Sequence, residues 1–499
     1  MDDARNASPK MAQKMISPSR RDFVKGIASA ATLAGVMGAT PRTRGEDQTS
    51  SQAPQKKPNV ILYVADQMRW DFVGAYGLNS STKTPNLDKI VQRGVAFTGA
   101  VTNQPLCSPS RACMMTGRYA TETGMWKLPP PTELRRDLPT LATILRENGY
   151  TANFIGKWHL APGGDGNAGY VAPEYRGGFL DFWEGANVLE WTSHPYEGTI
   201  WDGQGNPITY KDRYRVDFLT ERAVRFLKRP QEKPFLLFIS QLEPHFQNNE
   251  HRFVAPNGYA ERFQNPFVPQ DLLHLPGDWQ AQLPDYYGCI EKIDESVGTI
   301  LQTLEEQNQL DNTIFLFTSD HGCQFRTRNE EYKRSPHDSS IRVPFVAQGP
   351  GLNQSLSLSE ITGHINLAPT LLESVGIAAP KSMKGVSLLP LMRDPQARRD
   401  WSNKALIQIS ESMVARAIRT KEWTYCVADP TLDGGKDASS MRYQEYQMYN
   451  NYSDPAQLVN LAGRQPFRQD AAQLREEVLA MIVESGEPKP TITPARLYP

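Results

Sequence analysis

The chain is poor in cysteine and almost neutral in charge, and each of these features excludes a class of protein. It has five cysteines among 499 residues, and no CxxC pair or regular spacing joins them. The sequence therefore supports neither a zinc knuckle nor a disulfide framework. The formal net charge is -1 and charged residues make up 22% of the chain, so no nucleic-acid partner is expected. An anionic ligand would have to bind at a local site.

A long hydrophobic segment is also lacking. The run from Gly26 to Ala39 is weakly apolar and rich in alanine and glycine, and it is shorter than the ~20 residues that span a bilayer. It follows Arg20 and Arg21, an arrangement that resembles a twin-arginine export signal. We expect residues 1–45 to be a signal peptide for the twin-arginine translocase and residues 46–57 to be a polar linker. This predicts a periplasmic or secreted protein without stable membrane association; a weak membrane anchor is the alternative.

Four short apolar runs each lead to polar residues. The runs and their polar ends are Val60–Ala65 with Asp66 and Gln67, Ile314–Phe317 with Asp320 and His321, Phe235–Ile239 with His245, and YTANFIGKWHL with Lys157 and His159. Short unbroken apolar runs are typical of strands buried on both faces of a parallel sheet. Helical patterns lie between them, for example over residues 84–95 and 215–229. The alternation predicts an α/β fold with helices on both faces of the sheet.

Ligands of open α/β sheets bind at the carboxyl ends of the strands, so the polar residues are expected to meet there. Asp66, Gln67 and Asp320 offer oxygen atoms, which suit a hard divalent cation such as calcium, and His321 adds a nitrogen. The remaining members are cations or protonatable groups, namely Lys157, Lys333, His159, His245 and Arg111. A metal surrounded by basic groups describes a pocket for a tetrahedral oxyanion ester.

Cys107 opens the segment CSPSRACMMTGRY. Pro109 favours the first turn of a helix and Ser108 is an expected N-cap, so Cys107 is predicted at a helix N-terminus, where negative charge is stabilised. A thiolate would also be stabilised there. The hard oxygen ligands are poor partners for a soft sulfur atom, however, and this favours an oxygen function at position 107.

These motifs identify the chain as a member of the type I sulfatases of the alkaline-phosphatase-like superfamily. CSPSRACMMTGRY resembles the C-x-P-S-R signature with its downstream T-G-R, and VADQ, GKWHL, PHF, TSDHG and KRSPHDSSIRVPFV resemble further family segments. The resemblance runs from about Pro58 to about Gly463. It implies a catalytic domain, 58–400, with a mostly parallel central sheet, and a small antiparallel-sheet subdomain with a tail, 401–499.

The resemblance also implies a mechanism. A maturation enzyme would oxidise Cys107 to Cα-formylglycine, whose hydrate supplies the nucleophilic oxygen. The resemblance implies a Ca²⁺ or Mg²⁺ site made by Asp66, Gln67, Asp320, His321 and residue 107. Lys157 and Lys333 would bind the sulfate, and His245 with Lys333 would protonate the leaving alcohol. His159 would remove a proton from the second hydroxyl, and Arg111 would orient the hydrate. Most family members carry aspartate where this chain has Gln67.

The sequence thus predicts an exported sulfatase that hydrolyses a sulfate monoester, most simply an O-sulfate of a sulfated carbohydrate. Two alternatives remain. Gln67 favours a phosphodiester or phosphonate monoester hydrolase. The other alternative is an inactive glycan-binding protein, and the presence of Cys107 argues against it.

The segment 175–207 is rich in glycine and aromatic residues. It is expected either to line a sugar subsite or to form a surface loop with its own small core, and the aromatic residues concerned are Trp183, Trp191, Tyr196 and Trp201. His251 and His337 are weaker candidates for the substrate rim.

Overall fold

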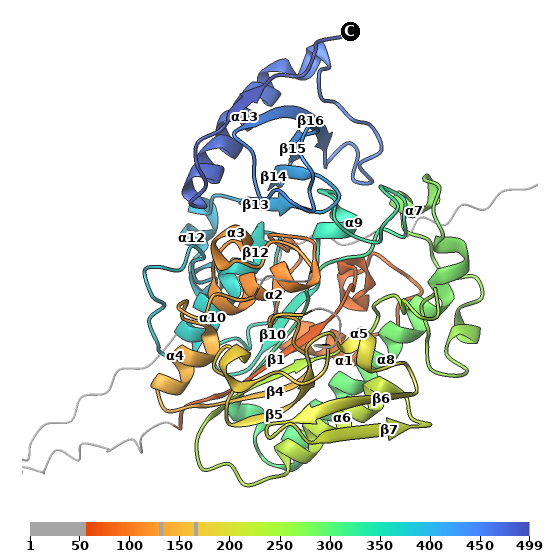
Figure 1. Cartoon of the computed structure of the whole chain (residues 1–499), viewed down its shortest axis with the longest axis vertical. Coiled ribbons are helices and arrows are strands. Elements are labelled where there is room, and N and C mark those ends of the chain that lie inside the picture. Colours follow the sequence, from red (N-terminus) through yellow and green to blue (C-terminus); the bar gives the residue numbers. More distant parts are fainter. Residues whose placement is uncertain (1–55, 129–132, 164–167, 499) are drawn as a thin grey trace, which may run out of the picture. The chain divides into compact units, whose positions relative to one another are not determined.

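A ten-stranded sheet with helices on both faces forms the centre of the protein (Figure 1). The computed structural model describes residues 56–128, 133–163 and 168–498, so the predicted signal peptide and most of the predicted linker lie outside the described residues. From edge to edge the strands are β11 (Leu356–Leu358), β2 (Val95–Phe97), β10 (Phe345–Gln348), β9 (Thr313–Ser319), β1 (Asn59–Ala65), β8 (Phe235–Ser240), β4 (Thr151–Lys157), β5 (Phe182–Ala186), β6 (Glu197–Asp202) and β7 (Pro207–Lys211). The expected α/β class is confirmed.

The four apolar runs of the sequence are four neighbouring strands, in the order β9, β1, β8 and β4. All of these neighbours pair in parallel, with Tyr63 of β1 beside Phe317 of β9 and beside Ile239 of β8. Because parallel strands end at the same edge of a sheet, the polar residues that follow them are brought to one place.

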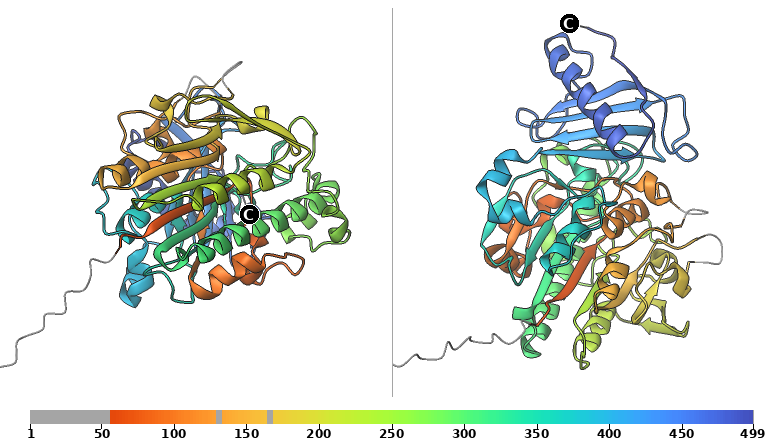
Figure 2. Two further views of the ribbon diagram at one scale, coloured as in Figure 1. Left: turned by 90° about the horizontal axis from the view of Figure 1, so that it is seen from below. Right: turned by 90° about the vertical axis from the view of Figure 1, so that its left-hand side faces the viewer.

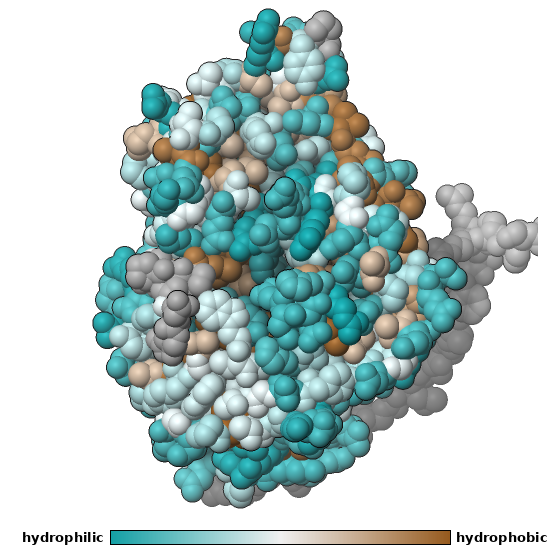
Figure 3. Space-filling model, turned by 45° about the vertical axis from the view of Figure 1, so that its right-hand side comes forward, coloured by the Kyte–Doolittle hydropathy of each residue, from teal (hydrophilic) through white to brown (hydrophobic). Residues whose placement is uncertain are grey.

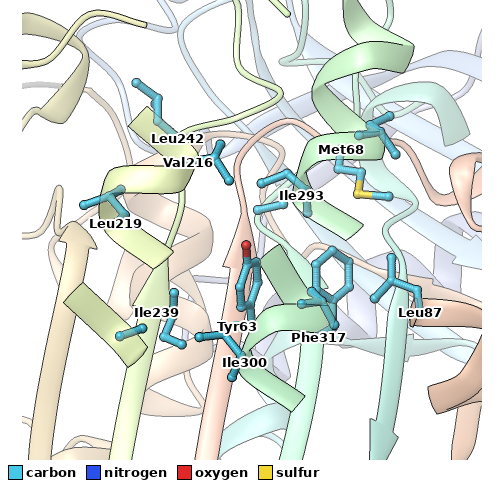
Figure 4. Close-up of a cluster of buried hydrophobic side chains, with 14 of the residues drawn as sticks. Tyr63, Met68, Leu87, Val216, Leu219, Ile239, Leu242, Ile293, Ile300 and Phe317 are labelled. Atoms are coloured by element: carbon cyan, nitrogen blue, oxygen red, sulfur yellow. The ribbon is translucent and has the colours of Figure 1, made fainter. Parts of the chain in front are cut away.

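Alternate residues of the central strands face two separate cores. Tyr63, Ile239 and Phe317 pack with helices α1 (Pro85–Arg93), α6 (Arg215–Leu227) and α8 (Trp279–Glu306), as Figure 4 shows for Val216, Leu219, Ile293 and Ile300. The opposite face packs with helices α2 (Cys107–Thr116), α4 (Leu141–Glu147), α10 (Leu367–Ser374) and α11 (Leu389–Arg393). Burial on both faces accounts for the unbroken apolar runs in the sequence.

The segment 175–207 is neither a surface loop nor a separate small core. Strands β5 and β6 and the start of β7 come from it and extend the central sheet, with helix α5 (Leu189–Thr192) between β5 and β6. Trp183 is 2% exposed and stacks on Phe154 at 4.4 Å between ring centroids. Many of the aromatic and glycine residues of this segment therefore belong to strands of the central sheet. The expectation of a surface loop was wrong.

The C-terminal strands form a second sheet that is buried on both faces (Figure 2). Its order is β13 (Lys404–Ile409), β14 (Val414–Thr420), β15 (Trp423–Asp429), β16 (Arg442–Asn450) and β17 (Thr491–Thr493), antiparallel except for the last pair. Helix α13 (Arg468–Glu484) covers one face. The other face packs against Val101, Ile341 and Ile361, so this sheet supports loops that lead to the site described below.

The face drawn in Figure 3 is largely hydrophilic and is hollowed near its centre. The exposed large apolar side chains include Tyr452 and Met441, which are 68% and 56% exposed. Within residues 56–128, 133–163 and 168–498, no helix combines the length and the apolar character that crossing a bilayer requires.

Candidate active site

Two carboxylates, an imidazole and a thiol converge where β1, β9 and α2 meet. Asp66 follows β1, Asp320 and His321 follow β9, and Cys107 is the first residue of α2. One potential ligand atom from each of these four buried residues lies within 4.8 Å of the others. The strand ends thus assemble most of the predicted metal ligands.

Arg111 forms an ion pair with one oxygen of each carboxylate. Its guanidinium lies 3.2 Å from Oδ2 of Asp66 and 3.0 Å from Oδ2 of Asp320, and all three side chains are fully buried. The Oδ1 atoms of both carboxylates lie 3.6 Å from Nε2 of His321. The imidazole Nδ1 is 2.9 Å from the carbonyl oxygen of Gly322, which favours a proton on Nδ1 and leaves the Nε2 lone pair toward the carboxylates. Burial and the nearby Asp66 charge raise the pKa of Asp320.

This donor set fits a hard divalent cation. Two carboxylate oxygens, one imidazole nitrogen and the atom at position 107 face a common centre, and a cation there would relieve the repulsion between the two carboxylates. The sulfur of Cys107 is the one soft atom in the set. It lies 3.7 Å from Oδ1 of Asp66 and 3.3 Å from Nε2 of His321.

Cys107 occupies the start of a buried helix, as predicted, but its cap differs from the prediction. The residue before the helix is Leu106, in an extended conformation and without a capping side chain, so Ser108 is not the N-cap. Every residue of α2 is buried, and the helix begins inside the protein at the end of the sheet. The positive end of the helix dipole therefore lies inside the protein, at the residue that belongs to the cluster.

Two lysines surround the position of the Cys107 sulfur with positive charge. Lys333 Nζ is 2.9 Å from the sulfur and 3.1 Å from Nε2 of His245. Lys157 Nζ is 2.7 Å from Oδ2 of Asp66. Burial opposes ionisation of the Cys107 thiol, but Lys157, Lys333 and His321 outweigh it and hold its pKa well below the usual value. The site therefore stabilises negative charge at position 107.

His245 comes from the loop after β8 and faces the same lysine. Its Nδ1 is 2.7 Å from the carbonyl oxygen of Phe246, so its Nε2 is presented to Lys333. Lys333 itself comes from the loop after β9, where Gln324 donates a hydrogen bond to its carbonyl oxygen at 2.9 Å. The structure thus brings His245 and Lys333 together, although 88 residues separate them in the chain.

Gln67 is buried beside the cluster in a strained conformation. Its φ is 68°, in the left-handed region that non-glycine residues seldom occupy. Its backbone N–H donates to Oδ1 of Asp320 at 3.1 Å, and its side-chain amide donates to the sulfur of Cys323 at 3.3 Å. With the amide nitrogen anchored on Cys323, the amide oxygen is turned away from that thiol. The predicted role of this oxygen as a metal ligand stays a prediction.

Sequence reasoning missed Glu190, which lies among the predicted residues. This carboxylate of α5 is 3.0 Å from Lys157 Nζ and 4.0 Å from Nδ1 of His159. A single glutamate in the stretch NVLEWTS carries no motif, so only the placement of α5 after β5 could have identified it. Ser240 was missed for the same reason; its hydroxyl accepts a hydrogen bond from Arg111 at 2.6 Å.

The weaker candidates do not join this cluster. His337 is 3% exposed and its ring nitrogens lie at hydrogen-bond distance from Ser335 and Tyr449, which identifies it as a structural residue. His251 is an exposed turn residue with φ 52°. Of the four aromatic residues proposed for a sugar subsite, Trp191 is 49% exposed, whereas the other three are buried or partly buried against a core.

Comparisons with known proteins point to one family. A protein-family model described as Sulfatase matches residues 58–377, and one described as N-sulphoglucosamine sulphohydrolase, C-terminal, matches residues 331–484. An ulvan-active sulfatase of Formosa agariphila is 30% identical over 457 residues, which cover 86% of this chain and 82% of the relative. An N-acetylglucosamine-6-O-sulfatase of Bacteroides thetaiotaomicron is 24% identical over 86% of each chain. A structure solved in complex with its substrate D-glucosamine-2-N,6-O-disulfate superposes with a TM-score of 0.69 at 24% identity, over 86% of this chain and 98% of that chain.

Proposed function

The chain belongs to the sulfatase family and is a hydrolase of sulfate esters, and from this premise we propose that it is an exported enzyme that removes O-sulfate groups from a sulfated carbohydrate. In this proposal residue 107 is converted to Cα-formylglycine and a divalent cation, Ca²⁺ or Mg²⁺, binds beside it. The observation that carries the proposal is the position of Cys107, at the start of a buried helix among hard ligand atoms and two lysines. These hard oxygen ligands suit an oxygen atom at position 107 better than a soft thiol sulfur.

The side chains of the site would divide into groups with different tasks. Asp66, Gln67, Asp320, His321 and residue 107 would hold the metal, whose charge would offset that of the sulfate oxygens. The aldehyde hydrate at position 107 would supply the attacking hydroxyl, and Arg111 would orient it from its place between the two carboxylates. The ammonium groups of Lys157 and Lys333 would bind sulfate oxygens as the ester bond breaks.

Proton transfers would fall to the two histidines that face the site. His245 presents Nε2 next to the ammonium group of Lys333, so a proton from Lys333 could pass by way of that atom to the oxygen of the leaving alcohol. His159 follows β4 and would accept a proton from the second hydroxyl at position 107. Both histidines are almost fully buried, at 6% and 4% exposure, which keeps bulk water from these transfers.

The carbohydrate part of the proposal is supported by the descriptions of two of the matches. Two matches are described by amino sugars, the N-sulphoglucosamine sulphohydrolase C-terminal region and the N-acetylglucosamine-6-O-sulfatase. The phosphonate or phosphodiester alternative rests on Gln67 alone.

A substrate panel tests the proposed function. Purified enzyme, produced together with a formylglycine-generating maturation enzyme, is incubated with defined sulfated saccharides, an aryl sulfate, a phosphodiester and a phosphonate monoester. We expect sulfate release from the saccharides with kcat/KM above that for both phosphorus esters. Preference for a phosphorus ester would establish the alternative hydrolase, and binding of the saccharides without turnover would establish a glycan-binding protein.

Export by the twin-arginine route belongs to the proposal, as does the division into residues 1–45, 46–57, 58–400 and 401–499. Replacing both Arg20 and Arg21 with lysine should leave the precursor in the cytoplasm, because the translocase reads the arginine pair. Fractionation followed by immunoblotting measures the outcome. Normal export of the double variant would mean that this N-terminal segment is not a twin-arginine signal.

Changes at Gln67 are expected to separate metal affinity from substrate preference. Gln67→Asp keeps an oxygen atom and adds a negative charge, so it should tighten calcium and repel the anionic substrate, a phosphate monoester dianion more than a sulfate monoester anion. Gln67→Leu removes the oxygen and should weaken calcium binding about 10-fold or more. Calcium titrations and kcat/KM for matched sulfate and phosphate esters measure both effects.

A buried glutamine outside the site provides the control. Gln408 of β13 is 1% exposed and lies in the C-terminal sheet, so Gln408→Leu should leave calcium affinity unchanged. If Gln67→Leu bound calcium and turned over ester like the parent enzyme, Gln67 would be no ligand. The metal site would then consist of Asp66, Asp320, His321 and residue 107.

A further inference from the structure

Glu190 is a buried carboxylate within the site to which the mechanism above gives no task. Its side chain is 9% exposed, and one oxygen, Oε1, is 3.0 Å from Lys157 Nζ. Burial acts to raise its pKa, but Lys157, His159 and His245 outweigh burial and lower the pKa to about 2. The carboxylate is therefore negatively charged at neutral pH, next to a lysine expected to bind sulfate.

Neutralising Lys157 does not account for this charge. Lys157 already has a carboxylate partner in Asp66, at 2.7 Å, and Asp66 is fully buried. The second oxygen of Glu190, Oε2, is buried and has no hydrogen-bond partner among the residues that the structure describes. A buried ionised oxygen without a partner is costly, so its presence calls for a partner that is one short movement away.

His159 offers such a partner. Its Nδ1 is also buried, finds no hydrogen-bond partner within the described part of the chain, and lies 4.0 Å from Oε1 of Glu190. His159 is also among the residues whose interaction with Cys107 lowers the pKa of that thiol. The imidazole therefore lies close to both residue 107 and Glu190. Hydrogen bonds of this kind are often long in a site without substrate and shorten in the complex.

The backbone fixes the relative position of the two side chains. The N–H groups of Trp158 and His159 donate to the carbonyl oxygens of Ala186 and Asn187, at 2.9 and 2.8 Å. Glu190 follows Asn187 by three residues, on α5. His159 has φ 61°, a left-handed conformation that is unfavourable for a residue with a side chain. The end of β4 is thus held in a strained conformation against the segment that carries Glu190.

We propose that Glu190 is a positioning residue for His159. Its carboxylate accepts a hydrogen bond from Nδ1–H of His159, which selects the tautomer whose Nε2 lone pair faces residue 107. Residue 107, His159 and Glu190 then form a nucleophile, base and orienting group in series. The inference rests on the proposed function, since it deepens the role given there to His159.

The tautomer of His159 tests the proposal without any turnover. The full-length protein carrying Cys107→Ala is labelled with ¹⁵N-histidine, and two-bond ¹H–¹⁵N spectra report which ring nitrogen carries the proton, with His159→Asn used for assignment. We expect the Nδ1–H form for His159 in this protein, and a shift toward Nε2–H when Glu190→Gln is added. The proposal would be overturned if His159 carried its proton on Nε2 in the protein that retains Glu190. It would also be overturned if the His159 tautomer were the same with Glu190 and with Glu190→Gln.

Kinetics of the mature enzyme provide the second measurement. Glu190→Gln should lower kcat for an aryl sulfate by about 10²-fold or more. Without the carboxylate, His159 would adopt the tautomer that has no lone pair facing residue 107 and could not accept the proton. Glu184→Gln is the matched control: Glu184 is a buried glutamate of β5, 4% exposed, that pairs with Arg222 away from the site. It should leave kcat and the His159 tautomer unchanged.

The pattern of kinetic constants separates the alternatives. A rise in KM with kcat unchanged for Glu190→Gln would mean that Glu190 serves only Lys157 and sulfate binding, and the proposal would be wrong. An equal loss of kcat in Glu184→Gln would mark a general effect of losing a buried carboxylate and would also contradict it. If the parent enzyme hydrolyses no ester in the panel, the proposed function fails while the tautomer measurement still decides the role of Glu190.

Discussion

Replacing Cys107 with alanine is expected to lower kcat for a sulfate ester by about 10⁴-fold or more, the size of effect seen when a catalytic nucleophile is removed. Protein with an unmodified cysteine at this position should show the same loss, because the proposed nucleophile is an oxygen that only the modified residue supplies. Initial rates with an aryl sulfate measure both proteins, and mass spectrometry of the peptide containing residue 107 reports the aldehyde in active enzyme.

Cys113 provides a matched control for this change. It lies on the same helix, α2, it is fully buried, and burial raises the pKa of its thiol. Cys113→Ala should therefore lower stability slightly, through lost packing, and leave kcat close to that of the parent enzyme. Fully active enzyme that contained only unmodified cysteine at position 107 would contradict the mechanism.

Replacing Asp320 with asparagine is expected to weaken calcium binding by at least about 100-fold and to lower kcat/KM at limiting calcium in proportion. Even the loss of a residue that only supports a metal ligand costs about 10- to 100-fold in affinity, so the loss of a charged ligand should cost no less. The substitution keeps the shape of the side chain and leaves Arg111 paired with Asp66. Isothermal titration with calcium, together with rates across a calcium series, measures the effect.

Asp294 is the control for losing a buried aspartate. It is 1% exposed on α8 and accepts hydrogen bonds from the backbone N–H groups of Asn86 and Leu87 at the start of α1. Asp294→Asn should lower the melting temperature without changing the calcium affinity. Parental calcium affinity in Asp320→Asn would place the metal elsewhere and remove the basis for the proposed site.

The catalytic strands could be predicted because burial on two faces leaves a clear mark in a sequence. Val60–Ala65 and Ile314–Phe317 are unbroken apolar runs, and each proved to be a central strand with one core on either face. Strands of this kind must stop where polar residues begin, so Asp66 and Asp320 were predicted at strand ends. The segment 175–207 gave no such signal, since its strands lie toward the edge of the sheet and mix polar, aromatic and glycine residues.

The sequence by itself thus predicted most residues of the proposed site, the strands that lead to them and the helix that begins at Cys107. The spatial order of the strands, with β8 between β1 and β4, was decided only by the tertiary structure. The same is true of the pairing of Lys333 with His245 and the place of Glu190 beside His159. A polar residue in a loop leaves no periodic pattern in the sequence, and its partners are fixed only when strands distant in the chain pack side by side.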